Sequence, residues 1–170
     1  MLNSLLDPCI IIRVQSWDSQ AVVPSKVEQA FGIGWPREIG AAASGRADIL
    51  CTGPTDWLVI STNPDGPSLL QDLDKAFEES AFRATNVSSA LARIEIDGPE
   101  VRVLLNKGCE LDLHPPRFPP GRCARTRLAG MPVIIRCTSA STFECIVASS
   151  YRDYLVSWFT DASLEFAVTP

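Results

Sequence analysis

Residues 92–108 read ARIEIDGPEVRVLLNKG, and the spacing of their apolar residues changes once, at Gly98-Pro99. Before this dipeptide, isoleucines alternate with charged residues, which predicts a half-buried strand with Arg93, Glu95 and Asp97 in solvent. After it, the apolar residues follow helical spacing. We therefore expect a helix with Pro99 at its first position and Gly108 as its cap.

Downstream of this segment, the sequence predicts three further strands, at residues 123–128, 132–137 and 142–147. A final helix is expected to start near Ser150, with Asp153 at the capping-box position. Its inward side chains should be Tyr151, Tyr154, Leu155 and Trp158. Residues 164–169 would then close the sheet as an edge strand.

Upstream, a second group of elements is predicted. Residues 9–15 form a strand, residues 47–52 and 57–61 form a hairpin, and strand pattern returns from Ala84. Helices should open at Ser25, with Glu28 as a capping-box partner, and near Ser68.

The predicted hairpins outnumber crossover connections, so we expect an α+β fold, a mainly antiparallel sheet with helices packed on it. The length suits one domain of ordinary size or two small lobes. Only residues 63–67, rich in proline and glycine, resemble a boundary. We therefore predict a single domain over residues 1–170.

Composition argues against several classes of partner. The net charge is −5, and the 15 Lys and Arg residues are scattered, whereas a nucleic-acid-binding protein clusters them. No apolar stretch approaches the roughly 20 residues of a membrane-spanning helix, and residues 1–15 lack the pattern of a signal peptide. We expect a cytoplasmic protein that binds neither nucleic acid nor membrane.

The residues alone show no self-sufficient active site. The six cysteines include no Cys-x-x-Cys pair, so free thiols are expected instead of disulfides or zinc ligands. His114 could serve as a general base with Cys109 or Asp112, but no nucleophile signature surrounds Cys109. The Gly-x-Gly at residues 32–34 follows a helix and lacks the third glycine of a dinucleotide loop. Trp57 is expected in the core.

One segment is unusual. Residues 111–122 contain four prolines and the only histidine of the chain. Irregular loops that a fold keeps rigid are commonly contact or functional surfaces.

Several motifs in and around this loop carry a resemblance. Residues 98–100 (GPE), 104–109 (LLNKGC), 111–115 (LDLHP) and 118–124 (FPPGRCA) together resemble the gamma subunit family of heterotetrameric sarcosine oxidase. Residues 53–58 (GPTDWL) look like the Gly-Pro-Asp-Glu-Trp-Leu segment of that family, and residues 150–155 (SYRDYL) with Trp158 are similar to its closing helix. The similarity covers about residues 45–160. Residues 86–89 (NVSS) depart from the usual Asp-Val-Ser-His, which puts any contact of that acid and histidine in question here.

The resemblance implies a fold like the folate-binding domain of glycine-cleavage aminomethyltransferases. It also implies a complex that oxidises sarcosine to glycine, passes electrons through FAD and FMN to oxygen, and gives the one-carbon unit to tetrahydrofolate. These cofactors, with NAD and zinc, are attributed to partner subunits: larger flavin-bearing alpha and beta subunits and a small delta subunit. This chain would then be a non-catalytic accessory subunit, with no catalytic, cofactor-binding or metal-binding residue of its own.

Two alternatives stay open. One is a stand-alone folate-binding or aminomethyltransferase-like domain, in which Asp112 matches the aspartate of those enzymes. The other is a subunit of a related demethylase that acts on another N-methyl amine. In the accessory-subunit interpretation, the loop contacts the large subunits through Asp112, His114, Pro115, Phe118 and Arg122.

Overall fold

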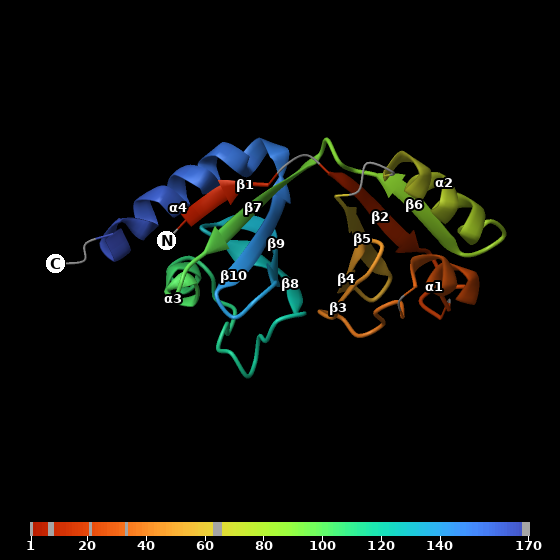
Figure 1. Cartoon of the computed structure of the whole chain (residues 1–170), viewed down its shortest axis with the longest axis horizontal. Helices are drawn as coiled ribbons and strands as arrows, with labels where there is room; N and C mark the ends of the chain where they lie inside the picture. Colours follow the sequence, from red (N-terminus) through yellow and green to blue (C-terminus); the bar gives the residue numbers. More distant parts are fainter. Residues whose placement is uncertain (1, 7–8, 21, 33, 63–65, 168–170) are drawn as a thin grey trace. The chain divides into compact units, whose positions relative to one another are not determined.

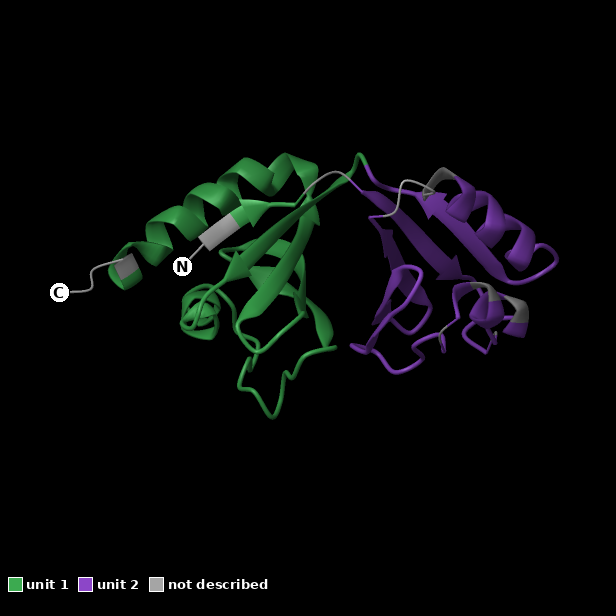
Figure 2. Ribbon diagram, viewed as in Figure 1, with its two compact units in different colours: residues 1–7, 89–170 green, residues 8–88 purple. Residues whose placement is uncertain are grey.

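The computed structural model of the chain describes residues 2–6, 9–20, 22–32, 34–62 and 66–167. The chain has two compact units, coloured separately in Figure 2: unit 1 comprises residues 1–7 and 89–170, and unit 2 comprises residues 8–88. Each unit has its own five-stranded sheet and its own helices (Figure 1). Residues 63–67, which resemble a boundary in the sequence, fall within the residue range of unit 2 and not between the two units. A single domain over residues 1–170 stays a prediction.

The sheet of unit 2 has the strand order β3-β4-β5-β2-β6, and all its neighbouring strands are antiparallel. Its strands are β2 (Ile10–Ser16), β3 (Ala42–Ser44), β4 (Asp48–Gly53), β5 (Asp56–Ser61) and β6 (Phe82–Asn86). Two helices, α1 (Ser25–Phe31) and α2 (Gly66–Phe77), complete the unit.

Aromatic side chains fill the core of unit 2. Trp35 packs edge-on against Phe31, Trp57 and Phe77, with ring centroids 5.9, 6.3 and 6.1 Å apart. Trp57 is 6% exposed, which confirms the prediction of a core tryptophan. Leu73 of α2 is fully buried in the same cluster, so the helix and the sheet share one apolar core.

The sheet of unit 1 has the order β1-β7-β10-β9-β8 and is also antiparallel. Its strands are β1 (Leu2–Leu5), β7 (Leu91–Asp97), β8 (Cys123–Leu128), β9 (Met131–Cys137) and β10 (Thr142–Ala148). The helices are α3 (Val101–Asn106) and α4 (Arg152–Ala167), and a short 3-10 turn, η1 (Ser149–Tyr151), precedes α4.

The core of unit 1 lies between this sheet and its helices. Ile94 and Ile96 of β7 and Phe143 of β10 are fully buried with Leu105 of α3 and Phe159 of α4. The two isoleucines alternate along β7 as the sequence predicts, because successive side chains of a strand point to opposite faces. The described part of the chain contains no helix that is both long and apolar enough to span a membrane.

Most predicted strands are confirmed, with shifts of their ends. Two short strands were not predicted, β1 and β3. The helix α2 starts at Gly66, before the predicted Ser68, and α3 starts at Val101 with Glu100 as its N-cap instead of starting at Pro99.

The predicted solvent exposure of the charged residues in β7 is wrong for Arg93. Its side chain is 10% exposed and pairs with the carboxylate of Glu144, which is 2% exposed. Arg136 of β9 also lies near this carboxylate, at 3.6 Å. Burial of this acid is tolerated because two guanidinium groups accompany it.

Both predicted capping boxes are wrong. Glu28 does not cap α1; its carboxylate accepts a hydrogen bond from the backbone N–H of Trp35 at 3.1 Å. Asp153 lies in the first turn of α4 and accepts a hydrogen bond from Nε of Arg152 at 2.8 Å.

The end of the chain also differs from its prediction. Residues 164–167 belong to α4 and not to an edge strand, while residues 168 and 169 lie outside the described part. Leu155 is fully buried and Trp158 is half-buried, as expected. Tyr151 and Tyr154 are instead 39% and 49% exposed, so their predicted inward orientation is wrong.

Candidate functional site

The proline-rich loop, residues 109–122, connects α3 to β8. Two hydrogen bonds close a turn at its tip, because the backbone N–H groups of Arg117 and Phe118 both donate to the carbonyl of His114 at 2.8 Å. The loop ends against β9, where the N–H of Gly121 donates to the carbonyl of Cys137 at 2.9 Å. Gly121 has φ +85°, a conformation that glycine adopts without strain.

Two side chains near the middle of the loop, Leu113 and Phe118, point into unit 1. Leu113 is fully buried and Phe118 is 5% exposed. The ring of Phe118 stacks on that of Phe143, with centroids 6.2 Å apart and planes 13° apart. Phe118, a predicted interface residue, therefore anchors the loop from inside and presents little of its own surface.

Arg102 of α3 joins the loop to the sheet. Its Nη1 donates to the carbonyl of Leu113 and, at 3.1 Å, to the carbonyl of Phe118. Its guanidinium lies 4.8 Å from the centre of the Phe143 ring, and Nη2 lies 3.5 Å from Sγ of Cys137. Sequence reasoning missed this residue, since no local pattern shows that an arginine will bind carbonyls eleven and sixteen positions further on.

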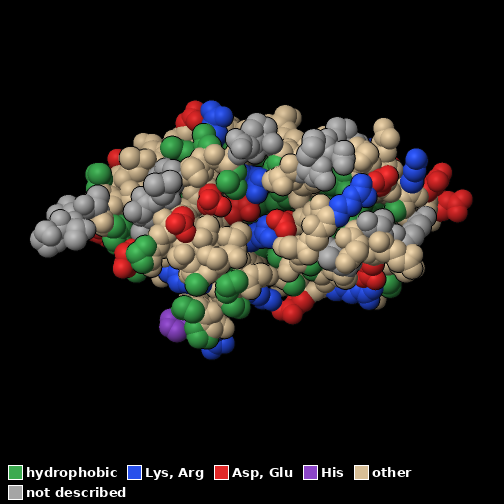
Figure 3. All heavy atoms as spheres, viewed as in Figure 1, with side chains coloured by type: hydrophobic (Ala, Val, Ile, Leu, Met, Phe, Trp, Pro, Cys, Tyr) green, Lys and Arg blue, Asp and Glu red, His purple; other side chains and the backbone are tan. Residues whose placement is uncertain are grey.

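Apart from Leu113, the side chains of residues 112–117 are exposed to solvent. Asp112, His114, Pro115, Pro116 and Arg117 are all exposed. Figure 3 shows the histidine, in purple, at the edge of the molecule beside green apolar side chains. We call residues 112–117 the loop tip. Its first turn is fixed locally, because Oδ1 of Asp112 accepts the backbone N–H of His114 at 3.0 Å.

Arg122, the last predicted interface residue, is half-buried where the loop enters β8. Its carbonyl accepts the N–H of Cys137 at 2.9 Å, and its own N–H donates to the carbonyl of Pro119 at 3.1 Å. Of the five predicted interface residues, the structure thus places Asp112, His114 and Pro115 together on the surface. It places Phe118 in the core and Arg122 at the base of the loop.

The Lys-Gly-Cys motif, residues 107–109, leads into the loop and contacts α4 and β8. Nζ of Lys107 donates to the carbonyl of Ala162 and pairs with Glu165, both at 2.6 Å, and lies 4.6 Å from the centre of the Phe166 ring. Gly108 has no left-handed φ angle. Instead, a Cβ at this position would lie 2.7 Å from the ring of Trp158. Its predicted role as a helix cap is therefore replaced by close packing against α4.

Cys109 completes the motif and is buried, with 6% exposure. Its Sγ lies 3.7 Å from Oγ1 of Thr126 on β8. The structure thus places this thiol in the core cluster and His114 on the surface, which supports the structural interpretation of Cys109 over a catalytic dyad.

The six cysteines, all within the described part of the chain, form no disulfide. Burial raises the pKa of the thiols of Cys51, Cys137 and Cys145, which keeps them protonated and poorly nucleophilic at neutral pH. Among the described residues, no group of three or more His, Cys, Asp or Glu side chains is arranged to hold a metal ion.

The GPTDWL motif also serves internal packing. Asp56 accepts two hydrogen bonds from Arg13, both at 2.8 Å, and this pairing raises the pKa of the arginine above its ordinary value. Nε1 of Trp57 donates to the carbonyl of Pro36 at 2.8 Å. These contacts hold the hairpin to β2 and to the segment at Pro36.

The NVSS segment ends the last strand of unit 2. Oδ1 of Asn86 accepts the N–H and the hydroxyl of Ser88, at 2.9 and 2.6 Å. Oγ of Ser88 accepts the N–H of Ile11 at 2.9 Å. An amide in place of the usual acid thus still supplies the acceptor that this turn requires.

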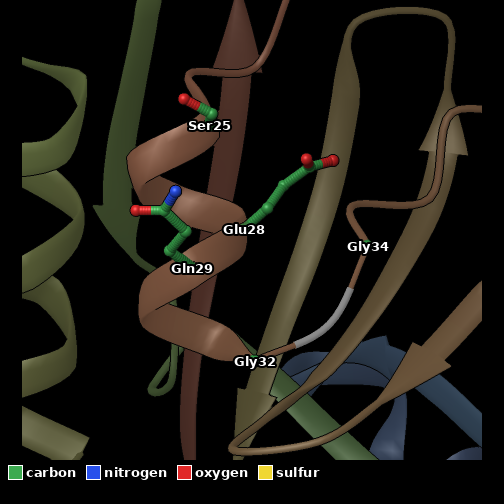
Figure 4. A pocket seen from close by; sticks show the side chains of 5 residues that line it. All are labelled: Ser25, Glu28, Gln29, Gly32 and Gly34. Atoms are coloured by element: carbon green, nitrogen blue, oxygen red, sulfur yellow. The ribbon is translucent and has the colours of Figure 1, made fainter.

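Figure 4 shows a shallow hollow beside α1, lined by Ser25, Glu28, Gln29, Gly32 and Gly34. The side chain of Glu28 points away from the helix, on the side where the loop at Gly34 passes. Its carboxylate is already bound to the backbone of Trp35 and lies 3.7 Å from Arg37. Since its charged group is committed to these neighbours, the hollow is not a good candidate for a ligand site.

The geometry can be compared with known proteins. A family model described as "Sarcosine oxidase, gamma subunit family" matches residues 17–165. The sarcosine oxidase subunit gamma of Corynebacterium sp. (strain P-1) is 31% identical over 145 residues, which cover 84% of this chain and 70% of that protein. The subunit gamma of an Arthrobacter species is 32% identical over 141 residues, covering 81% and 68%.

Two solved structures show similar folds. A chain of the heterotetrameric sarcosine oxidase from Corynebacterium sp. U-96, in complex with pyrrole 2-carboxylate, has TM-score 0.89 at 24% identity, covering 99% of this chain and 86% of that one. The glycine cleavage system aminomethyltransferase T from Bartonella henselae has TM-score 0.65 at 12% identity, covering 92% and 44%. These likenesses confirm the predicted α+β fold of aminomethyltransferase type.

Proposed function

Since this chain belongs to the sarcosine oxidase gamma subunit family, we propose that it is a non-catalytic accessory subunit of a heterotetrameric sarcosine oxidase. The observation that carries the proposal is the family match, which spans residues 17–165. The complex would oxidise sarcosine to glycine and give the one-carbon unit to tetrahydrofolate.

The contacts of the motif residues support an architectural role. Gly108 packs against Trp158, Asp56 pairs with Arg13, and Phe118 stacks on Phe143. These residues hold elements together, while the loop tip remains exposed. Such a surface suits contact with another protein chain.

In this proposal the redox and one-carbon chemistry belongs to partner chains. FAD, FMN, NAD, tetrahydrofolate and zinc are bound by larger alpha and beta subunits and a small delta subunit, and the whole complex is cytoplasmic. This chain contributes the loop tip to the interface, through Asp112, His114 and Pro115. Phe118 supports that surface from within the core, and Arg122 supports it from the base of the loop.

A second candidate is a stand-alone folate-binding or aminomethyltransferase-like domain. It is favoured by the fold shared with aminomethyltransferase T, of which this chain spans 44%. Asp112, its candidate functional acid, is exposed and accepts the N–H of His114 in a local turn. A subunit of a demethylase for another N-methyl amine is a variant of the first proposal, and the substrate would be bound by the partner chains.

The first test is co-expression of the tagged chain with its neighbouring genes. We expect a yellow complex that elutes as one species in size-exclusion chromatography and reduces its flavin when sarcosine is added. A colourless chain that elutes alone and binds tetrahydrofolate in titration would favour the second candidate instead.

The loop tip is tested in the same experiment with His114→Ala combined with Arg117→Ala. Both side chains are exposed, so the fold should persist while assembly weakens. Arg83→Ala is the matched control, because it removes an exposed arginine from β6 in the other unit. Unchanged assembly of the double variant would contradict the proposed interface.

A further inference from the structure

One charged side chain, that of Arg102, contacts both ends of the loop tip. Nη1 of Arg102 donates to the carbonyl of Leu113, near the start of the tip, and to that of Phe118, directly after its end. A single guanidinium group therefore bridges the two ends of the tip. Bridging the ends of a loop removes conformational freedom from the residues between them.

The guanidinium group is itself held in place from the sheet. It lies 4.8 Å from the ring centre of Phe143 on β10 and contacts Sγ of Cys137 on β9 at 3.5 Å. Within the described residues, its contacts are carbonyls, a thiol and an aromatic ring, and include no carboxylate. The guanidinium group of Arg102 thus orients two backbone carbonyls of the loop. A planar guanidinium has several N–H donors in fixed directions for this, whereas the ammonium group of lysine does not.

Other contacts would persist without Arg102. Leu113 and Phe118 would remain buried, and the turn at His114 is closed by its own backbone hydrogen bonds. The fold of unit 1 therefore does not depend on the arginine alone. What would change is the freedom of the tip to move relative to β9 and β10.

We propose that Arg102 is a positioning residue that holds the loop tip, residues 112–117, in the shape that a partner oxidase subunit binds. The proposal rests on the accessory-subunit function, and it assigns a role to a residue that does not touch the partner. A mobile tip must be ordered at the moment of binding, and this ordering lowers affinity without the loss of a contact.

Two variants test this proposal. Arg102→Met removes the guanidinium group and its charge, and Arg102→Lys keeps a positive charge without the planar guanidinium group. Arg83→Met is the matched control on the exposed face of β6. Limited proteolysis by trypsin measures how ordered the loop tip is, because trypsin cleaves after Arg117, the last residue of the tip, and cuts a mobile segment faster than an ordered one. Mass spectrometry detects the cleavage. Circular dichroism confirms that each full-length variant is folded.

We expect Arg102→Met to be cleaved after Arg117 about tenfold faster than the wild type and to bind the large subunits about tenfold more weakly. This magnitude is typical when the hydrogen bonds of a charged group are lost. Arg102→Lys should fall between the wild type and Arg102→Met, and Arg83→Met should match the wild type in both measurements. Protection of the wild-type tip from trypsin in the assembled complex would support the same conclusion.

Two results would overturn the proposal. One is an unchanged cleavage rate in Arg102→Met, which would show that the arginine does not order the tip. The other is faster cleavage with unchanged assembly, which would show that the order of the tip does not matter for binding. Failure of the wild-type chain to assemble is a different result, because it would overturn the accessory-subunit function itself.

Discussion

The absence of a side chain at Gly108 allows the end of α3 to pack closely against α4. A Cβ at this position would lie 2.7 Å from the Trp158 ring and 3.1 Å from the backbone nitrogen of Ala129. The backbone nitrogen donates to the carbonyl of Gly108 at 3.0 Å, so neither neighbour can retreat without loss of packing or of a hydrogen bond. Glycine is required here by close approach and not by an unusual φ angle.

We predict that Gly108→Ala lowers the free energy of unfolding by about 1–3 kcal/mol, the usual cost of overpacking a core. Thermal denaturation followed by circular dichroism measures this change. Gly34→Ala is the control, because nothing lies within 4 Å of the Cβ that it adds. Equal melting temperatures for the two variants would contradict the packing argument.

The candidate site was predictable at the residue scale only in part. Proline density located the loop, and Asp112, His114 and Pro115 are exposed as an interface requires. The inward orientation of Phe118 depends on Phe143, which lies on a strand that follows in the sequence, and the role of Arg102 depends on the same ring. Such contacts are set by tertiary packing, and no local spacing reveals them.

At the scale of elements, Lys107 connects the end of α3 to the last turns of α4. Its Nζ binds the carbonyl of Ala162 and Glu165 and lies over the ring of Phe166. A cation near the C-terminal end of a helix also interacts favourably with the helix dipole. This contact, between residues far apart in the sequence, favours helix over extended structure for residues 164–167.

We predict that Lys107→Met loosens the last turns of α4 and lowers the stability of the chain by about 1 kcal/mol. Hydrogen–deuterium exchange of the amides of residues 160–167 should accelerate, while exchange in α2 should not change. In Glu165→Gln the carbonyl and ring contacts remain, so its exchange should stay close to the wild type, because an exposed ion pair contributes little. If Glu165→Gln accelerated exchange as strongly as Lys107→Met, the ion pair would be the dominant contact.

The longer elements could be predicted from the sequence, and the short ones could not. Alternation over 92–97 and the apolar runs in β9 and β10 are long enough to indicate strands. The strands β1 and β3 have four and three residues and lie at sheet edges, where few side chains are constrained by burial. Their pairing with β7 and β4 determines them more than their own composition does.

At the scale of the whole molecule, buried thiols make stability depend on pH. Cys51 in unit 2 and Cys137 and Cys145 in unit 1 are fully buried. Burial raises the pKa of each above its ordinary value, and the neighbouring Glu144 adds to this effect at Cys145. As pH rises, the unfolded chain loses these protons at a lower pH than the folded chain does. The contribution of the thiols to stability is therefore fully present below a pH of about 8.5 and is lost as pH rises above it.

We predict that the free energy of unfolding falls above pH 8.5 by up to about 1.4 kcal/mol per pH unit for each such thiol. Urea unfolding at pH 7.5, 8.5 and 9.5, with a reductant present, measures the slope. Cys145→Ala should lower stability at every pH because it leaves a cavity, but its slope should be shallower than that of the wild type. Cys9→Ala, at a half-buried position, controls for the loss of a thiol. Parallel slopes for the wild type and Cys145→Ala would show that this thiol titrates alike in the folded and unfolded chain.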